Sequence, residues 1–111
     1  MVVADINSLP HTATSFFGFH IHEGNNCDGK DFSGSKGHYN PDSAPHPKHA
    51  GDLPPLMLCG NKAHSSFITD RFNVDDIIGR TVVIHNLPDD FTTQPSGNSG
   101  EKIACGIIKK P

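Results

Sequence analysis

The sequence predicts an all-β protein, an antiparallel sandwich or barrel that carries two long functional loops. Short runs that are β-branched or alternate between apolar and polar residues recur along the chain, while helical periods are scarce. Nine prolines and eleven glycines punctuate these runs. Short strands between such turn signals are typical of antiparallel sheets, and 111 residues suit a single domain covering residues 1–111.

The expected elements follow one another in chain order. The alternation is clearest in residues 16–22, where Phe17, Phe19 and Ile21 share one face of the strand, so we expect these three side chains to enter a core. The remaining elements are assigned from β-branched runs and the turn residues that bound them. We expect strands at residues 2–7, 16–22, 56–59, 63–72, 81–85 and 102–108, one helical turn within residues 74–79, and long polar loops at residues 23–52 and 87–100.

Charge and hydropathy exclude two classes of partner. The net charge is −3 and no run of Lys or Arg occurs, so the electrostatic footprint of a nucleic-acid-binding protein is missing. The longest apolar run is far too short to cross a bilayer. We therefore expect neither nucleic acid nor a membrane as a partner. No charged segment followed by an apolar run opens the sequence, so we expect no secretory leader in it, and this leaves the compartment open.

Eight histidines are the marked bias of the composition, and histidine is the commonest metal ligand. Four potential ligands lie in the Pro-rich residues 37–52, namely His38, His46, His49 and Asp52. Three imidazoles and one carboxylate fill the tetrahedral shell of Zn²⁺ and leave no open position, so this stretch predicts a structural zinc site. The alternative is a His-rich surface loop that binds no ion.

A second and independent signal comes from His20 and His22. Residues two apart on a strand share a face, so both imidazoles point away from the expected core residues. Two imidazoles side by side on a rigid strand form half of a copper or zinc site. This pair favours metal binding over the surface-loop alternative.

The chain has three cysteines, Cys27, Cys59 and Cys105, and none is spaced as C-x-x-C. This count indicates one disulfide and one spare cysteine rather than a zinc knuckle. Cys59 lies in a predicted strand, and we expect it to be a buried, small apolar residue. His11 and His64 fit no motif and are expected to face solvent.

Five segments together resemble the Cu/Zn superoxide dismutase family, of the bacterial type, and they occur in the family's order. They are residues 18–23, 37–41, 49–53, 79–85 and 104–108. The resemblance implies a Greek-key antiparallel sandwich or flattened barrel. It also implies that the chain begins after the family's first two strands, with about six of about eight strands present.

The resemblance further implies a copper ion and a zinc ion that share one bridging imidazole, together with a carboxylate that links a copper histidine to a zinc histidine. The implied residues are His20, His22, His38 and His85 for copper, His38, His46, His49 and Asp52 for zinc, Asp89 for the linking carboxylate, and Cys27 with Cys105 for the disulfide.

The activity implied by the resemblance is disproportionation of superoxide by copper cycling between Cu(II) and Cu(I), with zinc as support. His38 would release reduced copper and carry a proton. Lys102 stands where the family usually has an arginine that guides the anion, so the positive charge is kept but the planar fork is lost.

Three rival functions are a noncatalytic or copper-chaperone-like member of the same fold, a zinc-storing module, and an inactive fragment. Noncatalytic and chaperone-like members of the fold tend to lose copper ligands. Here all four copper histidines are present, which favours the enzyme. Missing strands would expose a sheet edge. Either the chain pairs into a homodimer through that edge, or its fold is compromised, or the start of the sequence is wrongly placed. The disulfide favours an extracellular, periplasmic or cell-envelope location.

Overall fold

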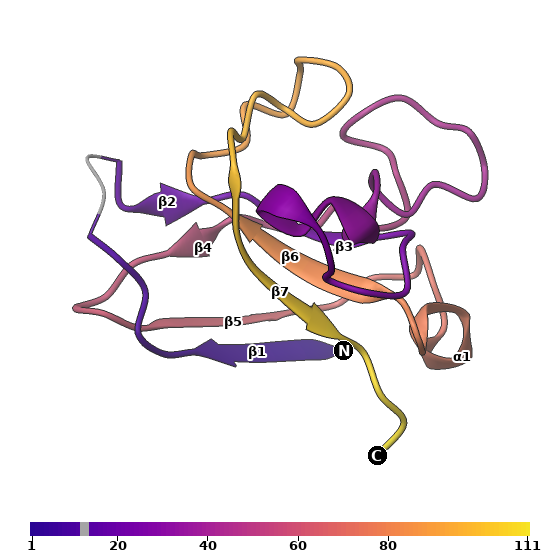
Figure 1. The fold of residues 1–111 in the computed structure, drawn as a ribbon, viewed down its shortest axis with the longest axis horizontal. Helices are drawn as coiled ribbons and strands as arrows, with labels where there is room; N and C mark the ends of the chain where they lie inside the picture. The colour runs from indigo at the N-terminus through magenta and orange to yellow at the C-terminus, as the bar shows by residue number, and fades with distance from the viewer. Residues whose placement is uncertain (12–13) are drawn as a thin grey trace.

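The computed structural model describes residues 1–11 and 14–111, and most of its regular structure is strand (Figure 1). The all-β class expected from the sequence is confirmed. The elements are β1 (Val2–Ile6), β2 (Phe16–Phe17), β3 (Phe19–His22), a 3-10 segment η1 (Lys30–Ser35), β4 (Leu56–Met57), β5 (Ala63–Phe67), a short helix α1 (Val74–Ile77), β6 (Thr81–His85) and β7 (Lys102–Ile107).

All strand pairs are antiparallel. The order β3-β6-β7 forms one sheet, while β1 pairs with β5 and β2 pairs with β4. At the centre of the three-stranded sheet, Val83 is in register with His20 on one side and with Cys105 on the other. The middle strand therefore places a candidate ligand and a disulfide cysteine at the same level of the fold.

The single strand expected at residues 16–22 is divided at Gly18. Before this residue β2 pairs with β4, and after it β3 pairs with β6. Gly18 itself donates its N–H to Leu87 O (2.8 Å) and accepts from the N–H of His85 (2.8 Å). The chain changes partner strand here, which alternation of side chains along the sequence does not reveal.

The strand expected at residues 63–72 is shorter in the structure, because β5 ends at Phe67. Ile68 then turns outward and is 87% exposed. Farther along, the Arg71 guanidinium donates to Pro47 O (2.8 Å) and to His49 O (3.1 Å). The segment after β5 thus supports the loop at residues 37–52. Likewise, only Leu56–Met57 of the expected strand 56–59 is regular.

Cys59 was expected to be buried and is instead exposed, as a free thiol at the turn between β4 and β5. The turn closes through Cys59 and Lys62, whose backbone groups hydrogen-bond to each other. Because β4 ends at Met57, Cys59 lies at a turn rather than in a strand, so the expected burial, which rested on a strand at residues 56–59, is wrong.

Residues 23–36 were expected to lack secondary structure, but they contain η1. The disulfide between Cys27 and Cys105 ties this segment to β7, with a Cα–Cα distance of 5.9 Å. The η1 segment consequently lies against β7 (Figure 1). The pairing implied by the family resemblance is therefore present.

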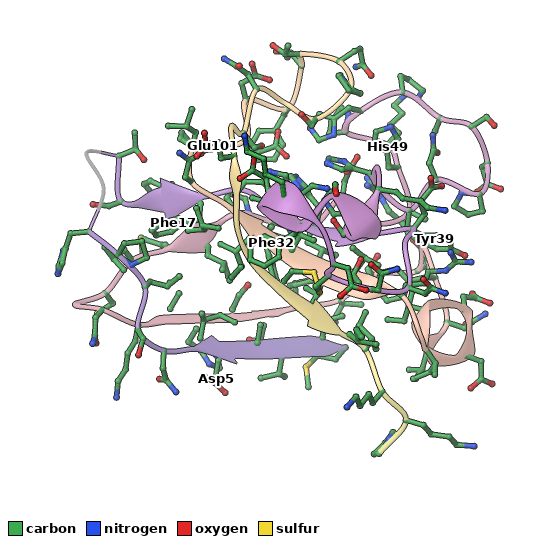
Figure 2. The ribbon with its side chains drawn as sticks, in the orientation of Figure 1. Asp5, Phe17, Phe32, Tyr39, His49 and Glu101 are labelled. Atoms are coloured by element: carbon green, nitrogen blue, oxygen red, sulfur yellow. A yellow bond between two sulfur atoms is a disulfide. The ribbon has the colours of Figure 1, made fainter. Side chains whose placement is uncertain are left out.

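The core lies between the β1–β5 pair and the three-stranded sheet, where apolar side chains fill the space (Figure 2). Phe17, Phe19 and Ile21 are all buried, as expected. Beside this core, an open groove of about 590 Å³ runs between β1 and β7. Within the described residues no strand pairs with the outer edge of either β1 or β7.

The expected helical turn is present as α1. It follows Asn73, whose N–H donates to the Asp76 carboxylate (2.9 Å). In the part of the chain that the structure describes, no helix has the length and apolar character needed to traverse a membrane.

Candidate metal centre

Strand pairing places three histidines of the candidate site. His20 and His22 lie on β3 opposite Val83 and Thr81, and His85 ends β6. Both β3 imidazoles point away from the core face, as expected, yet they are buried at 0% and 2% exposure because the long loops cover them. The face of β3 that points away from the apolar core is therefore also buried, and it is lined with imidazoles.

The loop at residues 37–52 is fixed to the edge of β3 by backbone hydrogen bonds. Tyr39 N–H donates to Ile21 O (2.8 Å), and Ile21 N–H donates to Gly51 O (2.8 Å). A side chain at Gly51 would collide with the carbonyl of Ile21, so only glycine permits this approach. The loop in this way brings its own ligands against those of the strand.

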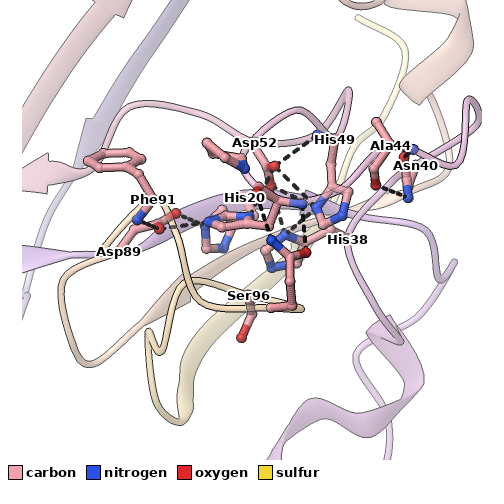
Figure 3. Close-up of polar contacts among 12 residues, drawn as sticks. His20, His38, Asn40, Ala44, His49, Asp52, Asp89, Phe91 and Ser96 are labelled. Atoms are coloured by element: carbon pink, nitrogen blue, oxygen red, sulfur yellow. Dashed lines mark hydrogen bonds and ion pairs between the residues drawn. The ribbon is translucent and has the colours of Figure 1, made fainter.

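Two groups of ligands meet at His38, which belongs to both (Figure 3). Within each group the ligand atoms lie within 4.8 Å of one another. We call them the strand-side group, His20, His22, His38 and His85, and the loop-side group, His38, His46, His49 and Asp52.

Asp89 connects the two groups from outside. Its Oδ2 lies 2.8 Å from His20 Nε2, and its Oδ1 lies 2.7 Å from His46 Nε2. Asp89 is itself held by the backbone N–H of Phe91, which donates to Oδ1 (2.8 Å) (Figure 3). Since an ionised carboxylate only accepts, both imidazoles carry their proton on Nε2 and turn Nδ1 inward.

The other two strand-side histidines have the opposite tautomer. His22 Nδ1 lies 2.7 Å from Lys36 O, and His85 Nδ1 lies 3.2 Å from Gly100 O. A carbonyl only accepts, so each Nδ1 donates and each Nε2 presents a lone pair. These two Nε2 atoms face each other at 3.2 Å. Two lone pairs at this distance repel unless a cation lies between them.

Three imidazole nitrogens of the two groups have no hydrogen-bond partner. His20 Nδ1, His38 Nε2 and His46 Nδ1 are buried and make no hydrogen bond. Buried polar atoms without partners are rare and costly, and three within one cluster require an explanation. Ligation explains them, because imidazole nitrogens suit copper and zinc. His20 Nδ1 and His38 Nε2 therefore fit a bound metal ion on the strand side, and His46 Nδ1 fits one on the loop side.

The loop-side group has the dimensions of a tetrahedral shell. His38 Nδ1 lies 2.7 Å from Asp52 Oδ1 and 3.1 Å from His49 Nδ1, and His46 Nδ1 lies 3.1 Å from Asp52 Oδ2 without the geometry of a hydrogen bond. Ligands about 2.0–2.1 Å from zinc are separated by roughly 3.3 Å in a tetrahedron. The loop-side group therefore fits zinc.

Burial keeps the imidazoles in the neutral form that binds metals. It lowers the pKa of His22 to about 2 and that of His85 to about 4, and it also lowers the pKa of His20 and His49. A neutral imidazole keeps the lone pair that a metal needs.

The two carboxylates are held ionised. Burial alone would raise the pKa of Asp52, but the hydrogen bond with His38 and the neighbouring imidazoles hold it below its usual value. The pKa of Asp89 is likewise held well below its usual range, against the effect of burial, by hydrogen bonds with His20 and His46. Both groups of ligands are thus ready to bind a metal near neutral pH.

Lys102 lies at the rim of a pocket of about 380 Å³ that opens onto the strand-side group. Its ammonium donates to Ser35 Oγ (2.8 Å) and to Lys36 O (2.9 Å). Burial lowers the pKa of Lys102. The lysine expected to guide an anion therefore lies at the pocket, but two of its three N–H groups are used within the protein.

Lys36 is the residue of this pocket that sequence reasoning missed. Its backbone has φ 61° and ψ −150°, a region populated almost only by glycine, at a cost of roughly 1–3 kcal/mol for other residues. Proximity to His38 along the sequence was the available signal. What the sequence does not show is the backbone conformation that places this lysine at the rim.

The expected site residues are all brought together, and the histidines expected outside the site are outside it. His11 is exposed, and the exposed His64 lies 2.6 Å from Asp5 Oδ1 in a separate surface pair. In the described chain a third cluster, His20, His46 and Asp89, also has ligand-like spacing, but its nitrogens are those already bonded to the linking carboxylate.

The sequence of this chain is similar to the members of one protein family. The family model described as copper/zinc superoxide dismutase (SODC) matches residues 1–108. The protein named Cu-Zn superoxide dismutase 1 from Aquifex aeolicus is 36% identical over 98% of this chain and 72% of its own length. The chain is thus shorter than this relative.

Solved structures agree with the sequence comparison. The Cu/Zn superoxide dismutase from Brucella abortus matches with a TM-score of 0.78 and 27% identity, over 95% of this chain and 77% of that one. A SOD-like protein from Bacillus subtilis matches with a TM-score of 0.77 and 34% identity, over 94% of this chain and 78% of that one. The sequence and the fold of this chain thus agree on one family.

Proposed function

Because the chain belongs to the copper/zinc superoxide dismutase family, we propose that it converts two superoxide anions and two protons into one dioxygen and one hydrogen peroxide. The observation that supports this activity best is the pair of ligand groups that share His38 and are joined from outside by Asp89. The strand-side group would hold copper, and the loop-side group would hold zinc.

The strand-side residues have the donors and the access that this chemistry needs. A bound copper ion would supply the one-electron exchange with superoxide. Nitrogen donors on strands β3 and β6 would hold such an ion in a fixed place, and the pocket at Lys102 leaves a path for a small anion from solvent.

We assign to His38 the transfer of a proton to the substrate. Its Nε2 is buried, has no hydrogen-bond partner and belongs to a side chain that lines the pocket. Its Nδ1 lies in the loop-side group, 2.7 Å from Asp52. The ring is thus held at one nitrogen while the other is free to take up and release a proton beside the substrate.

The loop-side group has a supporting role in this proposal. Its four protein ligands would fill the tetrahedral shell of a zinc ion and leave no position for a substrate. An ion there would hold the ring of His38 in place and, through Asp89, couple the loop to His20. We therefore assign this zinc to structure and to tuning of the shared imidazole.

The test is to reconstitute the protein with copper and zinc, and then to measure its rate of superoxide removal and its metal content. His85→Ala removes a strand-side ligand that the loop-side group does not use, so activity should fall to background while about one zinc per chain is retained. His64→Ala, an exposed histidine outside both groups, is the control and should keep full activity.

Two further outcomes decide between this function and its rivals. Two bound ions without turnover would overturn the proposal and support a noncatalytic or chaperone-like member of the family. One ion per chain, held by the loop-side group alone, would support a zinc-storing module instead. Failure of the chain to bind either ion would indicate an inactive fragment.

We also propose that the chain pairs with a second copy through β1. The outer edge of this strand has no partner within the described residues, and Val3 on it is 54% exposed. Two antiparallel β1 strands about a two-fold axis would satisfy each other's backbone groups. Val3→Lys should shift a dimer seen by analytical ultracentrifugation toward monomer. A parent protein that is monomeric at all concentrations would contradict this assembly.

The disulfide supports an extracellular, periplasmic or cell-envelope location, because such bonds persist in oxidising compartments. Quantifying free thiols in protein from its natural source under denaturing conditions tests this assignment. One reactive thiol per chain, from Cys59, is expected. Three would indicate a reducing compartment.

A further inference from the structure

The pocket over the strand-side group has an unusual charge balance. Its lining residues include His22 and His85, and the only Lys, Arg, Asp or Glu residues among them are Lys36 and Lys102. An anion that enters this pocket therefore meets two cations and no fixed negative charge. The rest of the chain is net negative, with an overall charge of −3.

The two lysines are placed differently. Lys102 directs its ammonium into the protein, toward Ser35 Oγ and the carbonyl of Lys36. Lys36 is exposed, and its ammonium makes no hydrogen bond or ion pair with any residue that the structure describes. Glu23 lines the neighbouring hollow together with Lys36 but forms no ion pair with it. The free positive charge at the rim is therefore that of Lys36.

The backbone of Lys36 is fixed at this rim by its own polar groups. Its N–H donates to Ser33 O (3.1 Å), and its carbonyl accepts from His22 Nδ1 (2.7 Å) and from Lys102 Nζ (2.9 Å). These bonds hold a φ of 61° that favours glycine. None of them uses the lysine side chain, so a glycine would serve the backbone better.

We propose that Lys36 is a second anion-recruiting residue, which draws the substrate anion into the pocket beside Lys102. This inference rests on the proposed function, because it concerns access to the strand-side group. Clefts lined by one sign of charge raise the local concentration of an oppositely charged substrate. At an exposed rim, one unit charge several ångströms from the anion changes its occupancy by roughly threefold in water.

Azide is the probe for this proposal, titrated into the copper- and zinc-loaded protein and followed by the visible absorption of copper. Lys36→Gln should raise the azide dissociation constant about threefold at low ionic strength, and the difference should vanish near 1 M salt, where the Debye length is about 3 Å. Lys36→Arg should restore the parent value. Lys62→Gln, in the β4–β5 turn, changes the net charge equally and should have no effect.

Lys36→Gly separates recruitment from a structural role. Relief of backbone strain should raise the melting temperature of this variant above the parent, while azide binding weakens as in Lys36→Gln. A glycine variant that binds azide as tightly as the parent would overturn the proposal, as would equal dissociation constants in Lys36→Gln and Lys62→Gln. A parent protein that binds no copper at the strand-side histidines would overturn the proposed function, and this inference with it.

Discussion

The two halves of the metal centre are built by different means. Three of the four strand-side ligands are fixed by sheet register, since His20 and His22 alternate along β3 and His85 ends the strand paired with it. The loop-side ligands instead come from residues 37–52, a stretch with almost no regular structure. We therefore expect the sheet to hold its ligands in place before a metal arrives, and the loop to gain more of its order from the metal.

The largest expected effect tests this difference directly. Zinc loading should slow amide hydrogen exchange in residues 37–52 by two orders of magnitude or more, because structural zinc contributes up to about 10–16 kcal/mol of binding free energy where a site folds around it. Exchange in β3 and β6 should change little. Mass spectrometry of exchanged peptides measures both regions in one experiment.

Asp52→Ala is the variant that tests the loop-side group, because Asp52 belongs to that group and not to the strand-side group. It should abolish the zinc-induced protection while β3 and β6 stay protected. Strong protection of residues 37–52 in metal-free protein would contradict the comparison, since the loop would then be ordered without an ion.

Next in size is the effect of the disulfide, which supports the strand side. Cys27→Ser combined with Cys105→Ser opens a link that spans 78 residues of sequence, and it should lower the free energy of unfolding by about 4 kcal/mol in urea titrations. Copper affinity should fall more than zinc affinity, because the tethered segment ends in the Lys36 carbonyl that orients His22.

Cys59→Ser is the matched control for that experiment. Cys59 is exposed and free, so its replacement should change the free energy of unfolding by less than about 0.5 kcal/mol. A larger effect from Cys59→Ser than from the double variant would show that the disulfide is not what holds this side together.

Much of the metal centre could be predicted from the sequence because its signals are local. Alternation places His20 and His22 on one face of β3 without knowledge of the rest of the fold. The spacing of His38, His46, His49 and Asp52 within one loop has the same property. Pairing across the fold, as for Cys27 with Cys105, came from the family resemblance rather than from spacing.

The wrong expectations concern positions where tertiary contacts override the local pattern. Gly18 ends a strand because the chain changes partner there, and β5 stops at Phe67 as the next segment turns to support another loop. Cys59 is exposed because the strand before it ends at Met57, two residues earlier than expected. Lys36 was missed since a positive φ in a non-glycine residue leaves no trace in composition or period.

A smaller effect is expected from acidification of the metal-free protein. In the folded state the pKa of His85 is lowered to about 4 and that of His22 to about 2, whereas the unfolded chain binds protons near 6.5. Between these values the unfolded state holds more protons, so stability is full above about pH 7 and falls as the pH drops toward 4. The loss should reach a few kcal/mol at pH 5 in urea titrations.

The exposed His64 gives the control for the pH series. His64→Asn should leave the pH dependence nearly unchanged, because this ring lies on the surface beside Asp5. His85→Asn should flatten the dependence, since one buried imidazole that resists protonation is removed. Stability that rises on acidification from pH 7 to pH 5 would contradict the burial of these rings.

The smallest effect concerns the carboxylate that joins the two halves. Asp89 fixes the tautomers of His20 on the strand and His46 on the loop, and an amide cannot accept from both rings with two oxygens. Asp89→Asn should therefore lower the affinity for both metal ions by about 10- to 100-fold, as measured by competition with chelators. Asp90→Asn, at the exposed neighbouring carboxylate bonded to Thr93, should leave both affinities unchanged. Loss confined to one ion would mean that the strand and loop halves are prepared independently, with Asp89 serving only one of them.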